Sequence, residues 1–208
     1  MSMRPIRRVP HPRPVSLAKF LREVVEILED AGVPHMLTGS LASAYYATPR
    51  ATQDVDLVID TDPAALQRVV VKLSEAGYYV DEGAALAALE SKGQFNAIDP
   101  AGGWKVDLII KKDRSFSRTE FDRRISASML GVEVSLASLE DVLLAKLEWS
   151  QMGDSELQRR DVVQLLERAG ERLDGPYVER WVLDLGLSDE WKNARERARF
   201  HLGQDDAS

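Results

Sequence analysis

Two aspartates in the first half of the chain have the spacing of a cation site. Asp54 and Asp56 alternate with apolar residues in the segment 54–59, a pattern typical of a β-strand. Residues i and i+2 of a strand point to the same face, so the two carboxylates lie side by side and repel unless a cation separates them. Oxygen ligands suit a hard ion such as Mg²⁺. The spacing therefore predicts a divalent metal site, with a metal-free acidic loop edge as the alternative.

A third carboxylate, Asp107, lies within the apolar run 104–110, which also has the composition of a strand. An unpaired carboxylate in such surroundings is costly, so Asp107 needs a partner. Two partners are open: a metal shared with Asp54 and Asp56, or a salt bridge to a neighbouring arginine or lysine.

Gly39 and Ser40 follow a short predicted strand, 35–38, and precede a predicted helix, 41–47. A helix N-terminus offers unpaired backbone N–H groups and the positive end of the helix dipole, which together favour phosphate. Gly39 lets a ligand approach the backbone, and Ser40 adds a hydroxyl. The alternative is a turn glycine followed by a capping serine.

Taken together, Gly39-Ser40, Asp54-Val55-Asp56-Leu57 and Val106-Asp107-Leu108 resemble the motifs of the nucleotidyltransferase superfamily of the DNA polymerase β type. Thr38 departs from the apolar residue that usually precedes the glycine. The resemblance implies a nucleoside triphosphate substrate, Mg²⁺ or Mn²⁺ as cofactor, and transfer of a nucleoside monophosphate. It also implies that Asp54, Asp56 and Asp107 are the catalytic and metal-binding residues.

A closer resemblance joins three further segments to those motifs. The segment 49–56 is similar to the Arg-x-Thr-x-Asp-x-Asp motif of the AbiEii/MenT-type toxin-like nucleotidyltransferases, and 139–146 and 159–165 are similar to their later helical motifs. Gln164 stands where members often have a second aspartate. This resemblance reaches residue 168 and adds Arg50, Lys146 and Asp161 to the nucleotide-binding residues.

These added residues have simpler interpretations as well. Arg50 either contacts phosphate or pairs with Asp54 or Asp56. Lys146 either neutralises the triphosphate or is an exposed helix lysine paired with Glu140 or Asp141. Asp161 is expected to orient Lys146 or an arginine rather than touch substrate.

The acceptor is left open by the residues. The resemblance implies RNA, such as a tRNA 3′ end, or a protein hydroxyl, with an antitoxin as a partner. The alternatives are a small aminoglycoside-like alcohol and a binding module without turnover. A basic strip gives RNA weak support, with a solvated helical face as its other interpretation; the strip consists of Lys111, Lys112, Arg114, Arg118, Arg123 and Arg124.

The remaining patterns predict a mixed α/β (α+β) fold, in which a small mixed sheet flanked by helices is followed by a helical C-terminal part. We expect a mobile basic arm over 1–15, a nucleotidyltransferase core over 16–135 and a helical region over 136–203. A helix is predicted over 117–126. The tryptophans at 149, 181 and 191 are expected to pack within helices.

Composition narrows the classes of protein further. The chain has 208 residues, no cysteine and a formal net charge of −7. Without cysteine there is no disulfide, thiolate zinc site or thiol nucleophile, and an acidic chain is poorly suited to broad nonspecific nucleic-acid binding. No apolar run approaches the roughly 20 residues that span a bilayer. We expect a cytoplasmic protein with no membrane partner.

Overall fold

The computed structural model describes residues 16–49, 51–153 and 155–205. Its helices are α1 (Leu17–Asp30), α2 (Gly39–Tyr46), α3 (Pro63–Glu75), α4 (Glu82–Ser91), α5 (Ser115–Asp122), α6 (Leu139–Gly153), α7 (Glu156–Ala169), α8 (Gly175–Asp184) and α9 (Ser188–Asp205), with a 3₁₀ turn at Gly170–Arg172. The strands are β1 (His35–Thr38), β2 (Asp54–Ile59), β3 (Tyr79–Val80), β4 (Gln94–Ile98), β5 (Lys105–Ile110), β6 (Ile125–Met129) and β7 (Val132–Leu136). The expected arm over 1–15 lies outside the described residues.

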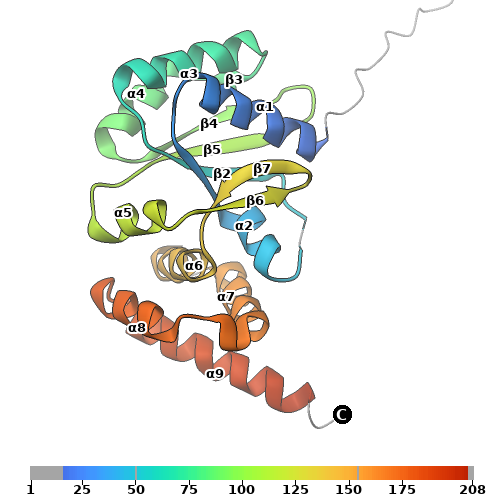
Figure 1. The fold of residues 1–208 in the computed structure, drawn as a ribbon, viewed down its shortest axis with the longest axis vertical. Helices are drawn as coiled ribbons and strands as arrows, with labels where there is room; N and C mark the ends of the chain where they lie inside the picture. The colour runs from blue at the N-terminus through green and yellow to red at the C-terminus, as the bar shows by residue number, and fades with distance from the viewer. Residues whose placement is uncertain (1–15, 50, 154, 206–208) are drawn as a thin grey trace, which may run out of the picture.

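Over this described part, seven strands form one mixed sheet in the order β3-β4-β5-β2-β1-β7-β6. β2 pairs with β5 and β1 with β7 in parallel, whereas the other neighbours are antiparallel. Helices α1, α3 and α4 cover one face, and α2 and the C-terminal helices lie on the other (Figure 1). The α/β prediction is confirmed.

Local sequence explains where the helices on the first face begin and end. Ser16 accepts a hydrogen bond from the backbone N–H of Lys19 and caps α1. Gly32 ends the same helix with a φ of +70°, a conformation that favours glycine. The apolar side of α1 is buried against the sheet, which gives the helix most of its stability.

The prediction of a helix over 117–126 is wrong in its second half. α5 ends at Asp122, and Ile125 begins β6, which pairs antiparallel with β7. Leu130 and Gly131 both have positive φ and form a two-residue turn between these strands. A leucine in the left-handed region is unusual. The turn sequence Leu130-Gly131 differs from the Asn-Gly or Asp-Gly that normally identifies a hairpin, so the sequence contains no signal for it.

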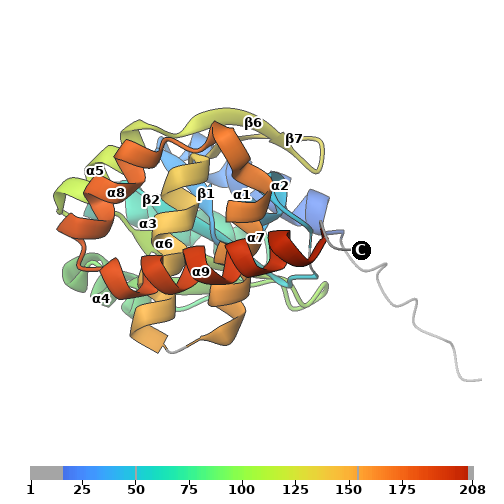
Figure 2. The same cartoon turned by 90° about the horizontal axis from the view of Figure 1, so that it is seen from below.

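The C-terminal helices pack on one another below the sheet. α6 packs against α7, and α9 crosses beneath both (Figure 2). Over the residues that the structure describes, we find no helix with the length and apolar content needed to cross a bilayer. α6 is the element that connects this layer to the sheet, because its N-terminus follows β7 directly.

Candidate active site

The register of β2 and β5 places two of the predicted acids next to each other. Asp56 is the direct partner of Asp107 on the parallel strands, and both side chains line the same cavity of about 230 Å³. Burial and then the neighbouring Asp107 charge raise the pKa of Asp56 above its ordinary value. Two adjacent carboxylates in a partly buried position are electrostatically unfavourable without a cation.

Gly39 makes the contact between this pair and helix α2. Its φ is +64°, and a Cβ atom added there would lie 1.9 Å from Asp56 Oδ2. The backbone N–H of Ser40 donates a hydrogen bond to the Asp56 carboxylate, which lowers the pKa of Asp56 against the larger effect of burial. The Asp56 carboxylate therefore lies against the first residues of α2, Gly39 and Ser40, which also line the cavity.

Asp54 extends the acidic row but is more exposed. It lies opposite Lys105 in the strand register, and 50% of its side chain is accessible to solvent. The Lys105 ammonium lies 2.8 Å from Asp107 Oδ2 and 3.5 Å from Asp54 Oδ1. The hydrogen bond to Asp107 raises the pKa of Lys105, so the lysine is charged. The predicted alternative of a salt bridge between Asp107 and a neighbouring lysine is thus present in the structure. The sequence prediction did not name Lys105, although its place two residues before Asp107 on a strand identifies it as a same-face neighbour.

Within the described ranges, no group of three or more acidic or histidine side chains converges as metal ligands do. The Lys105 ammonium supplies a positive charge near both Asp54 and Asp107. The chemistry of the donor set nevertheless suits a hard divalent ion, because all three groups are carboxylates and two of them, Asp56 and Asp107, are direct neighbours on paired strands.

Lys146 enters the same cavity from α6. It is only 3% exposed, and its Nζ lies 2.6 Å from Asp161 Oδ2 and 3.0 Å from Gln158 Oε1 on α7. The Lys146 charge also acts on Asp56, lowering its pKa. The alternative of an exposed lysine paired with Glu140 or Asp141 is wrong, because α7 packs over this side of α6 and supplies Asp161.

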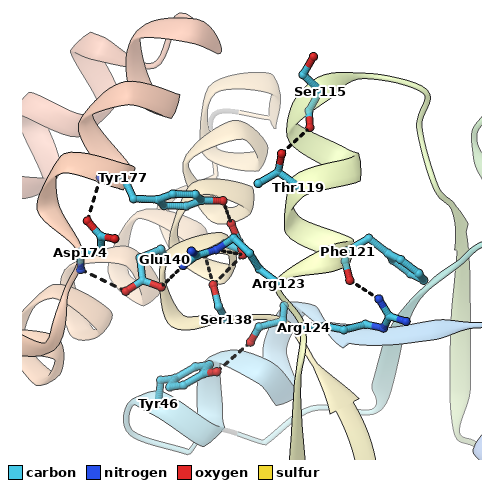
Figure 3. A network of polar contacts seen from close by, with 12 residues as sticks. Tyr46, Ser115, Thr119, Phe121, Arg123, Arg124, Ser138, Glu140, Asp174 and Tyr177 are labelled. Atoms are coloured by element: carbon cyan, nitrogen blue, oxygen red, sulfur yellow. Dashed lines mark hydrogen bonds and ion pairs between the residues drawn. The ribbon is translucent and has the colours of Figure 1, made fainter.

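A polar network fixes the N-terminal end of α6. The fully buried Asp141 accepts hydrogen bonds from Ser138 Oγ and Tyr177 Oη, both at 2.6 Å, and from Arg123 Nε at 3.4 Å. Figure 3 shows Arg123, Ser138 and Tyr177 converging from the ends of α5, α6 and α8. Burial raises the pKa of Asp141, and the three donors offset part of that shift. Through this network α8 is attached to the helix that presents Lys146.

Three of the six residues of the predicted basic strip pair with acidic side chains. Lys111 pairs with Asp60, and Arg114 makes two hydrogen bonds to Glu148 at 2.5 and 2.6 Å. Arg123 belongs to the network around Asp141. A role for the strip in RNA binding stays a prediction.

Arg50 lies outside the described residues, so its role stays a prediction. Trp149, which was expected to pack, is 49% exposed and lines the cavity. Trp181 does pack, with its ring centroid 5.2 Å from that of Phe116.

Comparison with known proteins gives the class of this fold. No protein-family model matches the chain, and no curated protein matches it in sequence. Among solved structures, the chain is similar to the antibiotic-resistance factor ANT(2'')-Ia in solution, with a TM-score of 0.55, 13% identity, and coverage of 90% of this chain and 97% of that one.

The crystal structure of ANT(2'')-Ia with adenylyl-2''-tobramycin gives a TM-score of 0.53 at 12% identity, covering 88% of this chain and 99% of that one. A nucleotidyltransferase-like protein from Paracoccidioides brasiliensis is also similar, with a TM-score of 0.48, 21% identity, and coverage of 73% and 77%. The chain has the nucleotidyltransferase fold.

Proposed function

We propose that this chain is a metal-dependent nucleotidyltransferase that moves a nucleoside monophosphate from a nucleoside triphosphate to an acceptor hydroxyl. The observation that carries the proposal is the adjacency of Asp56 and Asp107 on neighbouring strands, against Gly39 at a helix start. Lys146 lines the same cavity from the opposite wall. This arrangement combines carboxylates for a metal with a helix N-terminus and an ammonium for phosphate.

Each group has a distinct part in the proposed reaction. Asp54, Asp56 and Asp107 hold the divalent ion, which supplies positive charge to the phosphate oxygens. The Gly39-Ser40 turn and Lys146 bind the phosphates, and Asp161 orients Lys146 through their 2.6 Å contact. The acceptor oxygen bonds to the α-phosphorus while the bond from that atom to the bridging oxygen breaks. Pyrophosphate leaves, and the acceptor proton passes to Asp107 as general base.

For the acceptor, we propose RNA, such as a tRNA 3′ end, or a protein hydroxyl, as the resemblance to toxin-like nucleotidyltransferases implies. In that case an antitoxin is the expected partner. Arg50 is included in this proposal as a phosphate contact.

A small cationic alcohol is the second candidate acceptor. The fold similarity to ANT(2'')-Ia, whose crystal contains adenylyl-2''-tobramycin, favours it, as does the net charge of −7.

The test incubates purified protein with each of four α-³²P-labelled NTPs and Mg²⁺ or Mn²⁺. Acceptors are total RNA, the protein itself and an aminoglycoside mixture. The Asp54→Ala/Asp56→Ala variant removes the predicted ligands, and Asp184→Asn, an exposed aspartate on α8, is the matched control. Label that depends on Asp54 and Asp56 but not on Asp184 supports transfer and identifies the acceptor. Triphosphate binding without label on any acceptor would favour a binding module.

A further inference from the structure

A second cavity of about 100 Å³ adjoins the one that holds the acids. The two share Thr38, Ile109, Ala145 and Trp149 as lining residues. Together they form a groove between the face of the sheet and α6.

The strand register gives this groove a direction. Gly39 and Ser40 line only the first cavity, where Gly39 lies against Asp56. Along β5 the same face continues from Asp107 past Ile109 to Lys111, four residues or about 13 Å further. The second cavity, which Lys111 lines and which Gly39 and Ser40 do not, therefore extends from the junction at Thr38 toward the C-terminal end of β5.

Trp149 lies over the junction of the two cavities. It follows Lys146 by three residues on α6, a spacing that places both on one side of the helix. Its exposed fraction is 49%, and Met152, one turn further and also at the second cavity, is 72% exposed. The helix thus presents an ammonium and then an open aromatic side chain to the same groove.

A nucleoside triphosphate has the same order of groups. Its phosphates need the cation and the helix start, and the attached nucleoside extends away from them past the reacting α-phosphorus. The flat face of an indole can stack on any nucleobase. Stacking is favourable because it removes the facing surfaces of the indole and the base from water.

We propose that Trp149 is the stacking platform for the nucleobase of the bound triphosphate, with the second cavity receiving the edge of the base. The inference rests on the proposed function and adds the residue that binds the nucleoside. Arg114 and Glu148, which are hydrogen-bonded to each other, also line the second cavity and make its wall polar.

The test compares binding of ATP with binding of inorganic tripolyphosphate, each with Mn²⁺, by calorimetry. We expect Trp149→Ala to weaken ATP binding about ten- to a hundredfold while tripolyphosphate affinity changes less than about threefold. Trp149→Phe should restore most of the ATP affinity. Leu183→Ala, a truncation of an exposed side chain on α8, is the control for unspecific effects of losing apolar surface.

Three results would overturn the inference. Equal ATP affinity in Trp149→Ala and the parent would show that the base binds elsewhere, with the proposed function intact. A raised acceptor KM with unchanged ATP affinity would assign Trp149 to the acceptor. Failure of the parent to bind either ATP or tripolyphosphate would refute the proposed function together with this inference.

Discussion

Replacing Gly39 with alanine tests the candidate site at its closest contact. Gly39 has a φ of +64°, so an alanine there destabilises the folded state by about 1–2 kcal/mol, the cost of the left-handed conformation. The added Cβ would also lie 1.9 Å from Oδ2, 2.5 Å from Cγ and 2.8 Å from Cβ of Asp56. Because even the Asp56 Cβ is too close, rotation of the carboxylate alone does not relieve the clash.

Gly32 provides the matched control for the backbone cost. Its φ is +70°, and a Cβ there would meet nothing within 4 Å. For a chain of this size, about 1–2 kcal/mol corresponds to a fall in Tm of roughly 2–8 °C, which we expect in Gly32→Ala. The Tm of Gly39→Ala should fall by at least as much as that of Gly32→Ala.

The two variants should differ sharply in function. Displacing the Asp56 carboxylate by about 1 Å is expected to reduce nucleotidyl transfer about a hundredfold in Gly39→Ala. Gly32→Ala should keep the parent rate when both are assayed well below their Tm. If Gly39→Ala transferred label within about threefold of Gly32→Ala, the close packing of Gly39 on Asp56 would have no role in catalysis.

Three further changes separate the roles of the other residues. Asp107→Asn should abolish transfer yet leave triphosphate affinity within about tenfold of the parent in calorimetry; equal loss of both would contradict its role as general base. Lys146→Ala leaves Asp161 buried without its ammonium partner, so we expect about 3–5 kcal/mol of lost stability in urea denaturation and weaker triphosphate binding. The double variant Lys146→Met/Asp161→Leu should recover the stability but not the triphosphate affinity. Triphosphate affinity equal to that of the parent in this double variant would show that Lys146 does not contact phosphate. Burial raises the pKa of Glu120 from 4.5 to about 8, so the folded state retains a proton that the unfolded state releases. The stability this provides is complete below about pH 4.5 and is lost as the pH rises to about 8. Glu120→Gln should flatten the fall in unfolding free energy between pH 5 and pH 8, and identical slopes in both proteins would refute the shift.

The strands that carry the acids could be predicted because their signal is local. The predicted strand 54–59 matches β2, and the parallel pairing that brings Asp56 to Asp107 is consistent with the resemblance. β6 was not predictable in the same way. Its three middle residues are small, and its turn relies on Leu130 with positive φ, so the strand depends on pairing with β7 and on burial of Ala127 and Met129 in the core.

Burial of charged groups was harder to predict than the elements that carry them. The motif indicated that Lys146 and Asp161 are related, but not that both are almost wholly buried, since that depends on how α7 packs on α6. Trp149 shows the reverse case. Its position on a helix suggested packing. Its exposure depends on the groove between the sheet and α6, which forms only when the two pack together. Side chains at element junctions are therefore the part of the site that needed tertiary structure.

If a divalent ion binds as we propose, the Lys105 ammonium would make that binding an exchange of cations. The ammonium lies 2.8 Å from Asp107 Oδ2 and 3.5 Å from Asp54 Oδ1, so the incoming ion would displace one positive charge as it supplied another. The free energy of binding would then be a difference between two neutralised states, and we expect the rise in Tm with Mg²⁺ to be correspondingly small. The displaced ammonium, on its flexible stem, would be able to turn toward a phosphate bound at the same site.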